Sequence, residues 1–167
     1  ASTEAEQVFY LSKEIDNYFS SVFKQTMYTE FENDLYRLKT NFDLTSDILS
    51  ERYLSVIKKY YGDNVVYDEI VSNEWSRLGH IYRWSYYPYK YATGLLMASV
   101  VVNSLTLENT LSKDDYINFL SAGSSQYSLD LLKMLNIDLV NTDIMETGFN
   151  VMAKDINELQ KVLCLKR

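Results

Sequence analysis

Apolar residues recur at intervals of three and four along the first forty positions of the chain. This spacing places their side chains on one face of an α-helix and predicts an amphipathic helix. No Gly or Pro interrupts the segment, so we expect one long helix from about Glu4 to Thr40, with a kink allowed near Thr26. Its apolar stripe comprises Val8, Leu11, Ile15, Tyr18, Val22, Met27, Phe31, Leu35 and Leu38.

Shorter periodic segments follow, and turn residues separate them. Thr45 or Ser46 is placed to cap a second helix, which runs to Tyr61 and ends at Gly62. A third helix is expected over about 66–78, and the aromatic segment after it is expected to form a loop.

The segment from Tyr89 to Leu107 is apolar almost all round, which is typical of a buried central helix. Ser112 and Asp115 then form a capping box at the start of another helix. That helix is expected to turn four apolar side chains inward: Tyr116, Ile117, Phe119 and Leu120.

Two more helices complete the pattern. Ser128 is expected to cap a short one and Thr142 a longer one. The longer helix contains Cys164, which we expect to be a small buried apolar residue. One Pro and five Gly are too few for the frequent turns of an all-β protein. The fold class predicted is all-α, with about seven helices in a single domain over residues 1–167.

Charge and apolar content exclude several kinds of partner. Sixteen basic residues stand against twenty-three acidic ones, giving a net charge of −7 without any block of Lys and Arg. Nucleic acid and anionic membrane surfaces are therefore not expected partners. The longest apolar run, Leu95 to Val102, is too short to span a bilayer, and no signal peptide pattern precedes the first helix. We expect a cytoplasmic protein.

The chemistry-bearing residues are concentrated in His80 to Gly94, which reads HIYRWSYYPYKYATG. It holds the only His, the only Pro, five of the fifteen tyrosines and one of the two tryptophans. Because Tyr and Trp join an apolar body to a polar tip, such a run is either a wet groove or a hydrogen-bonded core seam.

Catalytic metal and nucleophile patterns are absent from the sequence. A catalytic zinc needs three protein ligands, whereas the chain has one His, one Cys and no HExxH. We therefore expect no metal in this chain alone. A Ser-His-Asp arrangement with His80 has no nucleophile elbow to support it.

Hydrogen-bond donation is the chemistry that His80 and the tyrosines offer. When water attacks a peptide carbonyl, donors beside the resulting oxyanion are each worth roughly 3–4 kcal/mol. Arg83 and Lys90 are candidates for receiving a peptide carboxylate, and the turn after Gly123 for meeting an anion. The alternative is structural: the His bonds a backbone carbonyl, the tyrosines fill a core seam, the cations are solvated and the turn is ordinary.

Three segments of the chain resemble oligoendopeptidase F, a zinc metallopeptidase family related to the thimet oligopeptidase group. Phe23 to Glu32 (FKQTMYTEFE) is similar to the family's FRQTMFAEFE helix. His80 to Gly94 resembles its His-aromatic stretch ending in Tyr-x-Tyr-x-Tyr-Ala-Thr-Gly, and Ala122 to Leu132 resembles its Gly-Gly-Ser turn. The order and spacing agree from about Glu14 to Leu163. Departures occur at three positions: Gly79, Pro88 and Ser128.

The resemblance implies an all-α catalytic region that cleaves oligopeptides, with zinc held on an HExxH segment and a downstream Glu. Those residues would precede Ala1, so this chain would be the C-terminal part and inactive alone. We assign catalysis to His80, Tyr87 and Tyr89. We assign substrate binding to Tyr82, Tyr86, Tyr91, Arg83 and Gly123.

The expected partners are an oligopeptide substrate and the upstream zinc-binding part of the same protein. Two rival interpretations stay open. One is a non-enzymatic helical module that binds peptides or a partner, and the other is a purely structural role for the aromatic residues.

Overall fold

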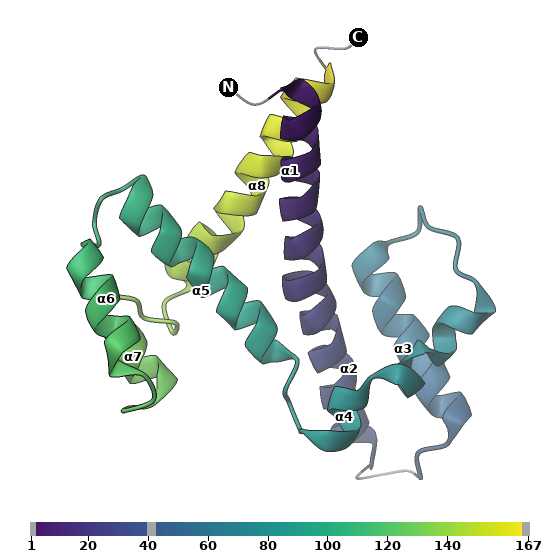
Figure 1. Ribbon diagram of the computed structural model, residues 1–167. Helices are drawn as coiled ribbons and strands as arrows, with labels where there is room; N and C mark the ends of the chain where they lie inside the picture. The colour runs from purple at the N-terminus through teal and green to yellow at the C-terminus, as the bar shows by residue number, and fades with distance from the viewer. Residues whose placement is uncertain (1–2, 40–42, 165–167) are drawn as a thin grey trace. The chain divides into compact units, whose positions relative to one another are not determined.

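The computed structural model describes residues 3–39 and 43–164, and every regular element in these ranges is a helix (Figure 1). The all-α fold class is therefore confirmed. A π-helical segment η1 spans Phe19–Phe23 and a 3-10 helix η2 spans Glu69–Arg77. The α-helices are α1 (Glu4–Tyr18), α2 (Lys24–Lys39), α3 (Ser46–Tyr61), α4 (Gly79–Arg83), α5 (Tyr89–Thr106), α6 (Lys113–Ala122), α7 (Ser128–Lys133) and α8 (Thr142–Cys164).

The long N-terminal helix is interrupted earlier than the sequence predicts. A turn of π-helix over Phe19–Phe23 separates α1 from α2, whereas we expected a kink near Thr26. The wider turn changes the backbone hydrogen bonding, and the Gln25 side-chain amide donates to the Ser20 carbonyl at 3.2 Å. The predicted end of the helix at Thr40 lies outside the described residues.

Most predicted helix ends are confirmed by their hydrogen bonds. Thr45 caps α3 by accepting a backbone N–H at 3.4 Å, and Gly62 ends the same helix at a φ of +74°. The Ser112 hydroxyl accepts from the Asp115 N–H at 3.1 Å and donates to its carboxylate at 2.6 Å. Ser112 is thus the predicted cap and places α6 at the expected residues, although the Asp115 carboxylate accepts from the Ser112 hydroxyl rather than from the backbone N–H that a capping box uses.

Three predicted starts are wrong. The third helix does not begin near residue 66, because Asp68 caps a 3-10 helix by accepting the Ile70 N–H at 3.1 Å. Ser128 does not cap α7 but is its first helical residue, and Tyr127 stands in the cap position without a side-chain hydrogen bond. Thr142 is likewise the first residue of α8, and the Asn141 side chain accepts the Asp143 N–H at 2.9 Å. Residue type alone did not identify these cap positions, because they depend on the turn before each helix.

The chain forms two compact units, 1–18 with 94–167 and 19–93. The single domain expected from chain length stays a prediction. In the first unit α1 lies beside α8 (Figure 1). Tyr18 is fully buried, and its hydroxyl meets the Ser99 hydroxyl and lies 3.0 Å from the Gly148 carbonyl. This burial raises the pKa of Tyr18, so the phenol remains neutral and satisfied inside the unit.

The second unit has a core of apolar side chains between α2 and α3. The Phe31 and Tyr53 rings meet edge to face with centroids 5.1 Å apart. Leu78 and Ile81 pack against this core and bracket His80 in the sequence, so the core determines where the imidazole is held. The fully buried members of the core are Met27, Phe31, Tyr53, Val56 and Ile57.

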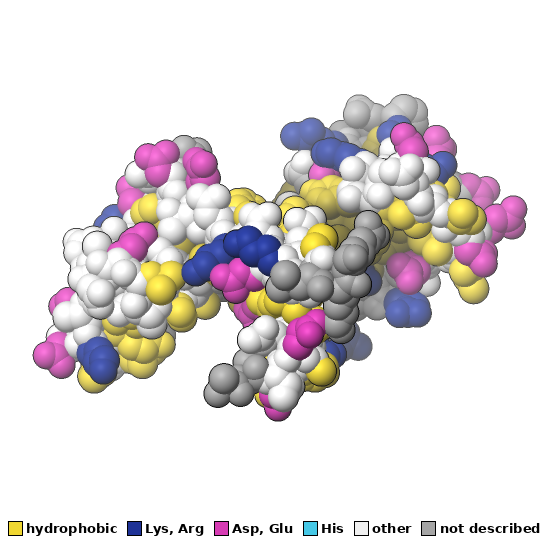
Figure 2. Space-filling view, turned by 90° about the horizontal axis from the view of Figure 1, so that it is seen from above, with side chains coloured by type: hydrophobic (Ala, Val, Ile, Leu, Met, Phe, Trp, Pro, Cys, Tyr) yellow, Lys and Arg dark blue, Asp and Glu magenta, His cyan; other side chains and the backbone are white. Residues whose placement is uncertain are grey.

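Several apolar residues are more exposed than their pattern predicts. Ile117 and Leu120 on α6 are 55% and 57% exposed, so the prediction that they turn inward is wrong. Cys164 is exposed as well, contrary to expectation. Figure 2 shows hydrophobic side chains gathered on the surface at the left, where α6 and α7 lie in Figure 1. Helical periodicity identifies which face of a helix is apolar, but it does not show whether another element packs against that face.

In the ranges that the structure describes, no helix has both the length and the apolar character needed to span a lipid bilayer.

Two glycines allow a test of how closely α8 approaches α5. Both lie in helix interiors, where Ala is favoured over Gly by about 1 kcal/mol. A Cβ added at Gly94 would contact no atom described outside its own helix, so Gly94→Ala is expected to raise Tm. A Cβ at Gly148 would lie 2.9 Å from the Leu96 side chain and 3.3 Å from its carbonyl oxygen. Crowding of this kind costs roughly 1–3 kcal/mol, so Gly148→Ala is expected to lower Tm. Thermal unfolding followed by circular dichroism compares the two, and a rise in both would contradict the close approach.

Candidate functional site

The aromatic stretch begins in a helix rather than in the loop that we expected. Gly79–Arg83 form the single turn of α4, and His80 is its second residue. A turn follows, and the buried Pro88 directly precedes α5, where its missing N–H costs nothing. A short connection therefore joins α4 to α5, and side chains of α4 can contact side chains at the start of α5.

Four rings form an aromatic cluster, which we define as His80, Trp84, Tyr87 and Tyr91. The His80 and Tyr87 rings are stacked, with centroids 5.5 Å apart and planes 6° apart. Tyr91 approaches His80 edge-on, with its hydroxyl 3.3 Å from Nε2, and Trp84 lies 5.6 Å from Tyr87. His80 lies in α4 and Tyr91 in α5, whereas Trp84 and Tyr87 lie in the non-helical segment between these helices, so the cluster brings together rings from both helices and from their connection.

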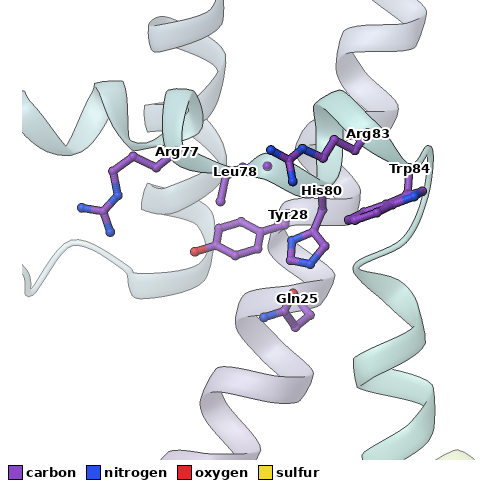
Figure 3. A pocket seen from close by; sticks show the side chains of 8 residues that line it. Gln25, Tyr28, Arg77, Leu78, His80, Arg83 and Trp84 are labelled. Carbon is purple, nitrogen blue, oxygen red and sulfur yellow. The ribbon is translucent and has the colours of Figure 1, made fainter.

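A cavity of about 340 Å³ opens beside the cluster (Figure 3). Its volume falls in the range of ligand pockets. Gln25 and Tyr28 reach it from α2, and Figure 3 shows the Tyr28 ring beside the imidazole of His80, with Trp84 on the imidazole's other side. The full lining is Gln25, Tyr28, Arg77, Leu78, Gly79, His80, Arg83 and Trp84.

The cavity lining carries positive charge and no carboxylate. Arg77 and Arg83 both border it, although the whole chain has a net charge of −7. The buried Oε1 atom of Gln25 accepts no hydrogen bond from the residues that the structure describes. An anionic group, such as the carboxylate end of a peptide, would complement the positive charge of this lining.

None of the predicted tyrosines is among the residues that line this cavity, and their surroundings differ. Tyr87 and Tyr91 belong to the aromatic cluster, whereas Tyr82 and Tyr89 are 60% and 45% exposed. Partial burial raises the pKa of Tyr82, which keeps its hydroxyl protonated and able to donate. Exposure on this scale favours a wet groove over a core seam.

The other predicted residues belong to different parts of the fold. Arg83 borders the cavity, but Gly123 belongs to the other compact unit, where it ends α6 at a φ of +53°. Tyr86 is turned toward α2, where its N–H donates to Glu32 Oε1 at 2.7 Å and its hydroxyl to Asn33 Oδ1 at 3.2 Å. Its backbone is left-handed, with a φ of +54°, a conformation that costs about 1–2 kcal/mol for a residue with a side chain.

Three polar residues of the cavity lining lie outside the His80 to Gly94 stretch and were not predicted from the sequence. Gln25 and Tyr28 are three apart and therefore share a face of α2, within the segment that resembles the FRQTMFAEFE helix. Their shared face was the sequence feature that could have identified Gln25 and Tyr28 as site residues. Arg77 ends the 3-10 helix, and nothing in its sequence neighbourhood distinguishes it from other exposed cations.

The described residues do not fit a resident zinc ion. Throughout 3–39 and 43–164, His, Cys, Asp and Glu nowhere gather in threes in a way that would hold a metal. A catalytic zinc needs three such ligands. We therefore assign no metal-dependent step to these residues.

The family model described as "Peptidase family M3" matches residues 2–151. The chain belongs to peptidase family M3. This confirms the resemblance found in its three motifs, and the aromatic cluster and cavity are thus features of an M3 chain.

Curated relatives agree with the family. "Oligopeptidase PepF" of Bacillus subtilis is 34% identical over 161 residues, which are 96% of this chain and 24% of that protein. "Oligoendopeptidase F, chromosomal" of Lactococcus lactis subsp. cremoris is 29% identical over 164 residues, 98% of this chain and 27% of that protein. The M3 chain thus spans about a quarter of the length of these relatives.

A solved structure supports the fold of the M3 chain. The crystal structure of oligoendopeptidase-F from Enterococcus faecium matches with a TM-score of 0.86 and 28% identity. The match covers 98% of this chain and 31% of that one.

The stack of Tyr87 on His80 can be tested by NMR of the imidazole. Tyr87→Leu removes the ring while keeping an apolar side chain, so the His80 ring protons lose shielding and are expected to move downfield. Tyr82→Leu is the matched control, because Tyr82 makes no ring contact among the described residues. Equal shifts in the two variants would contradict the stacked arrangement.

Proposed function

We propose that this chain supplies the substrate-binding, oxyanion-stabilising part of an M3 oligopeptidase that hydrolyses short peptides. The observation that carries the proposal is the stack of His80 and Tyr87 beside a cavity bordered by Arg77 and Arg83. Donors and cations meet there in a chain that is otherwise acidic. Family membership supports the same reaction class.

Peptide hydrolysis forms a bond from water oxygen to the carbonyl carbon and then breaks the C–N bond. In between, the carbonyl oxygen carries negative charge, and donors aimed at it lower the barrier. We assign this donation to the His80 N–H and to the hydroxyls of Tyr87 and Tyr89. Where the Tyr91 hydroxyl donates to Nε2 of His80, the imidazole carries its proton on Nδ1, so that contact selects the donor atom.

The cations would hold the substrate's negative end. A guanidinium binds a carboxylate through two parallel hydrogen bonds, which also orients it. Arg83 and Arg77 thus take the peptide carboxylate, and Tyr82 and Tyr91 flank the chain of the substrate.

Zinc enters the proposal through the family resemblance alone. Because the chain spans about a quarter of the length of its relatives, we assign the metal-binding residues to the part of an M3 oligopeptidase that this chain does not span. Zinc would polarise the carbonyl and activate water there. The chain alone is then expected to be inactive toward peptides, and its cytoplasmic location remains a prediction from the sequence.

A non-enzymatic peptide-binding module is the second candidate. The absence of a three-ligand metal group from the described residues is what favours it. The two candidates share the cavity but differ in whether the tyrosine hydroxyls affect a chemical step.

The hydrolytic role is tested in the complete polypeptide that carries this chain. His80→Ala and Tyr87→Phe are each expected to lower kcat/KM for a short peptide by roughly 10²–10³-fold, because a donor to the oxyanion is lost. The control is Tyr10→Phe on α1, which removes an exposed hydroxyl that is distant in sequence from the aromatic cluster. If Tyr87→Phe cleaves as fast as Tyr10→Phe, the donor role is wrong. Peptide cleavage by residues 1–167 alone would contradict the expectation that this chain is inactive by itself.

The carboxylate site is tested by binding of a fluorescently labelled peptide, measured by anisotropy. The double variant Arg77→Gln, Arg83→Gln is expected to bind a peptide with a free C-terminus about tenfold more weakly, because charge-assisted hydrogen bonds are lost. The same peptide with an amidated C-terminus should show no such difference. Arg52→Gln, an exposed cation on α3, is the matched control. Equal losses for both peptides would contradict carboxylate recognition.

A further inference from the structure

Glu32 is a fully buried carboxylate in the middle of α2, with 0% of its surface exposed. Oε1 accepts the Tyr86 N–H at 2.7 Å, while Oε2 accepts no hydrogen bond from the described residues. Burying a carboxylate is costly unless its hydrogen bonds repay the lost hydration. The burial of Glu32 therefore indicates a role that requires its hydrogen-bond acceptor and that an apolar residue would not perform.

Glu32 is one of three neighbouring residues of α2 that hold the turn before α5. Asn33 accepts from the Tyr86 hydroxyl at 3.2 Å, and the Tyr36 hydroxyl lies 2.9 Å from the Ser85 hydroxyl. The Tyr36 and Tyr86 rings also lie 5.3 Å apart. These residues are at positions i, i+1 and i+4, so one side of the helix meets the Ser85–Tyr86 turn.

The turn that Glu32 holds has an unfavourable backbone. The Tyr86 backbone is left-handed, with a φ of +54°, a conformation that residues other than Gly rarely adopt. A left-handed residue persists where its surroundings hold it, and here a carboxylate accepts its N–H. The next residue, Tyr87, stacks on His80, and Trp84 borders the cavity from the other end of the turn.

We propose that Glu32 is a positioning residue whose carboxylate holds the Tyr86 turn and thereby sets the Tyr87 ring against His80. Glu32 does not touch the substrate. Its effect on catalysis rests on the proposed function, whereas its effect on the turn does not.

The structural half of the proposal is tested by NMR on the ¹⁵N-labelled chain. Glu32→Ala removes the acceptor, so exchange of the Tyr86 amide hydrogen is expected to rise at least about tenfold. The His80 ring protons should move in the direction seen for Tyr87→Leu. Glu32→Gln keeps the shape and a carbonyl acceptor and should restore most of both signals.

Glu30→Gln is the matched control on the same helix. Glu30 bonds the Lys59 ammonium at 2.5 Å and the Tyr60 hydroxyl at 3.0 Å, and both belong to α3. Its loss weakens the contact between α2 and α3 but leaves the turn alone. We expect unchanged Tyr86 exchange and unchanged His80 shifts in this variant, at a temperature where all variants are folded.

The catalytic half is tested in the complete polypeptide. Glu32→Ala is expected to lower kcat roughly tenfold or more with KM within about twofold, since donors are misplaced rather than binding lost. Glu32→Gln should recover most of kcat, and Glu30→Gln should match the wild type.

The outcomes separate the two proposals. If Glu32→Ala alters Tyr86 exchange and the His80 shifts but His80→Ala cleaves normally, positioning stands and the proposed function fails. If folded Glu32→Ala leaves both NMR signals unchanged, positioning is overturned. Should Glu32→Ala not fold, Glu32→Asp withdraws the carboxylate by one methylene and takes its place under the same two criteria.

Discussion

The burial of Phe31 against Tyr53 is the contact on which the site-bearing unit depends. It fixes α2 on α3, and α2 then presents different side chains in different directions. One face supplies the core, a second reaches the cavity through Gln25 and Tyr28, and a third holds the Ser85–Tyr86 turn. A single helix therefore connects hydrophobic burial to the geometry of the aromatic cluster. Tyr60 also packs against this core, and its partial burial, together with its hydrogen bond to Glu30, raises the pKa of Tyr60 to about 12.

Charge adds a local feature that composition does not show. The chain is acidic as a whole, yet the lining of the cavity contains two guanidinium groups and no carboxylate. The Lys90 ammonium lies 5.0 Å from the centre of the Tyr87 ring, on the same segment. Positive charge is thus concentrated around the aromatic residues of a chain whose net charge is −7.

Helical periodicity and capping chemistry were sufficient for the fold class and for most helix ends, because both act over a few residues. The stripe of the first helix correctly placed Tyr18, Val22, Met27 and Phe31 in the interior. Exposure of Ile117, Leu120 and Cys164 was not predictable in this way, since it depends on what covers a helix rather than on the helix itself.

The site was predicted where its residues are neighbours in the sequence. His80, Tyr87 and Tyr91 are contained in one stretch, so their clustering could be expected. The left-handed Tyr86 and the buried Glu32 could not, because a Tyr gives no signal of a positive φ and a Glu gives no signal of burial. Both arise from contacts between α2 and a turn some fifty positions later, as the separation of Glu32 and Tyr86 shows.

The two tryptophans lie in different surroundings, and this gives the protein two built-in optical reporters. Trp75 is partly buried, packs on the core and donates from Nε1 to the Ser50 hydroxyl at 3.0 Å. Trp84 borders the cavity and is 54% exposed. Because indole emission shifts to longer wavelength in water, the same spectrum contains a component sensitive to the core and one sensitive to the cavity. Replacing either indole by Phe would leave a molecule whose fluorescence reports on only one of the two regions.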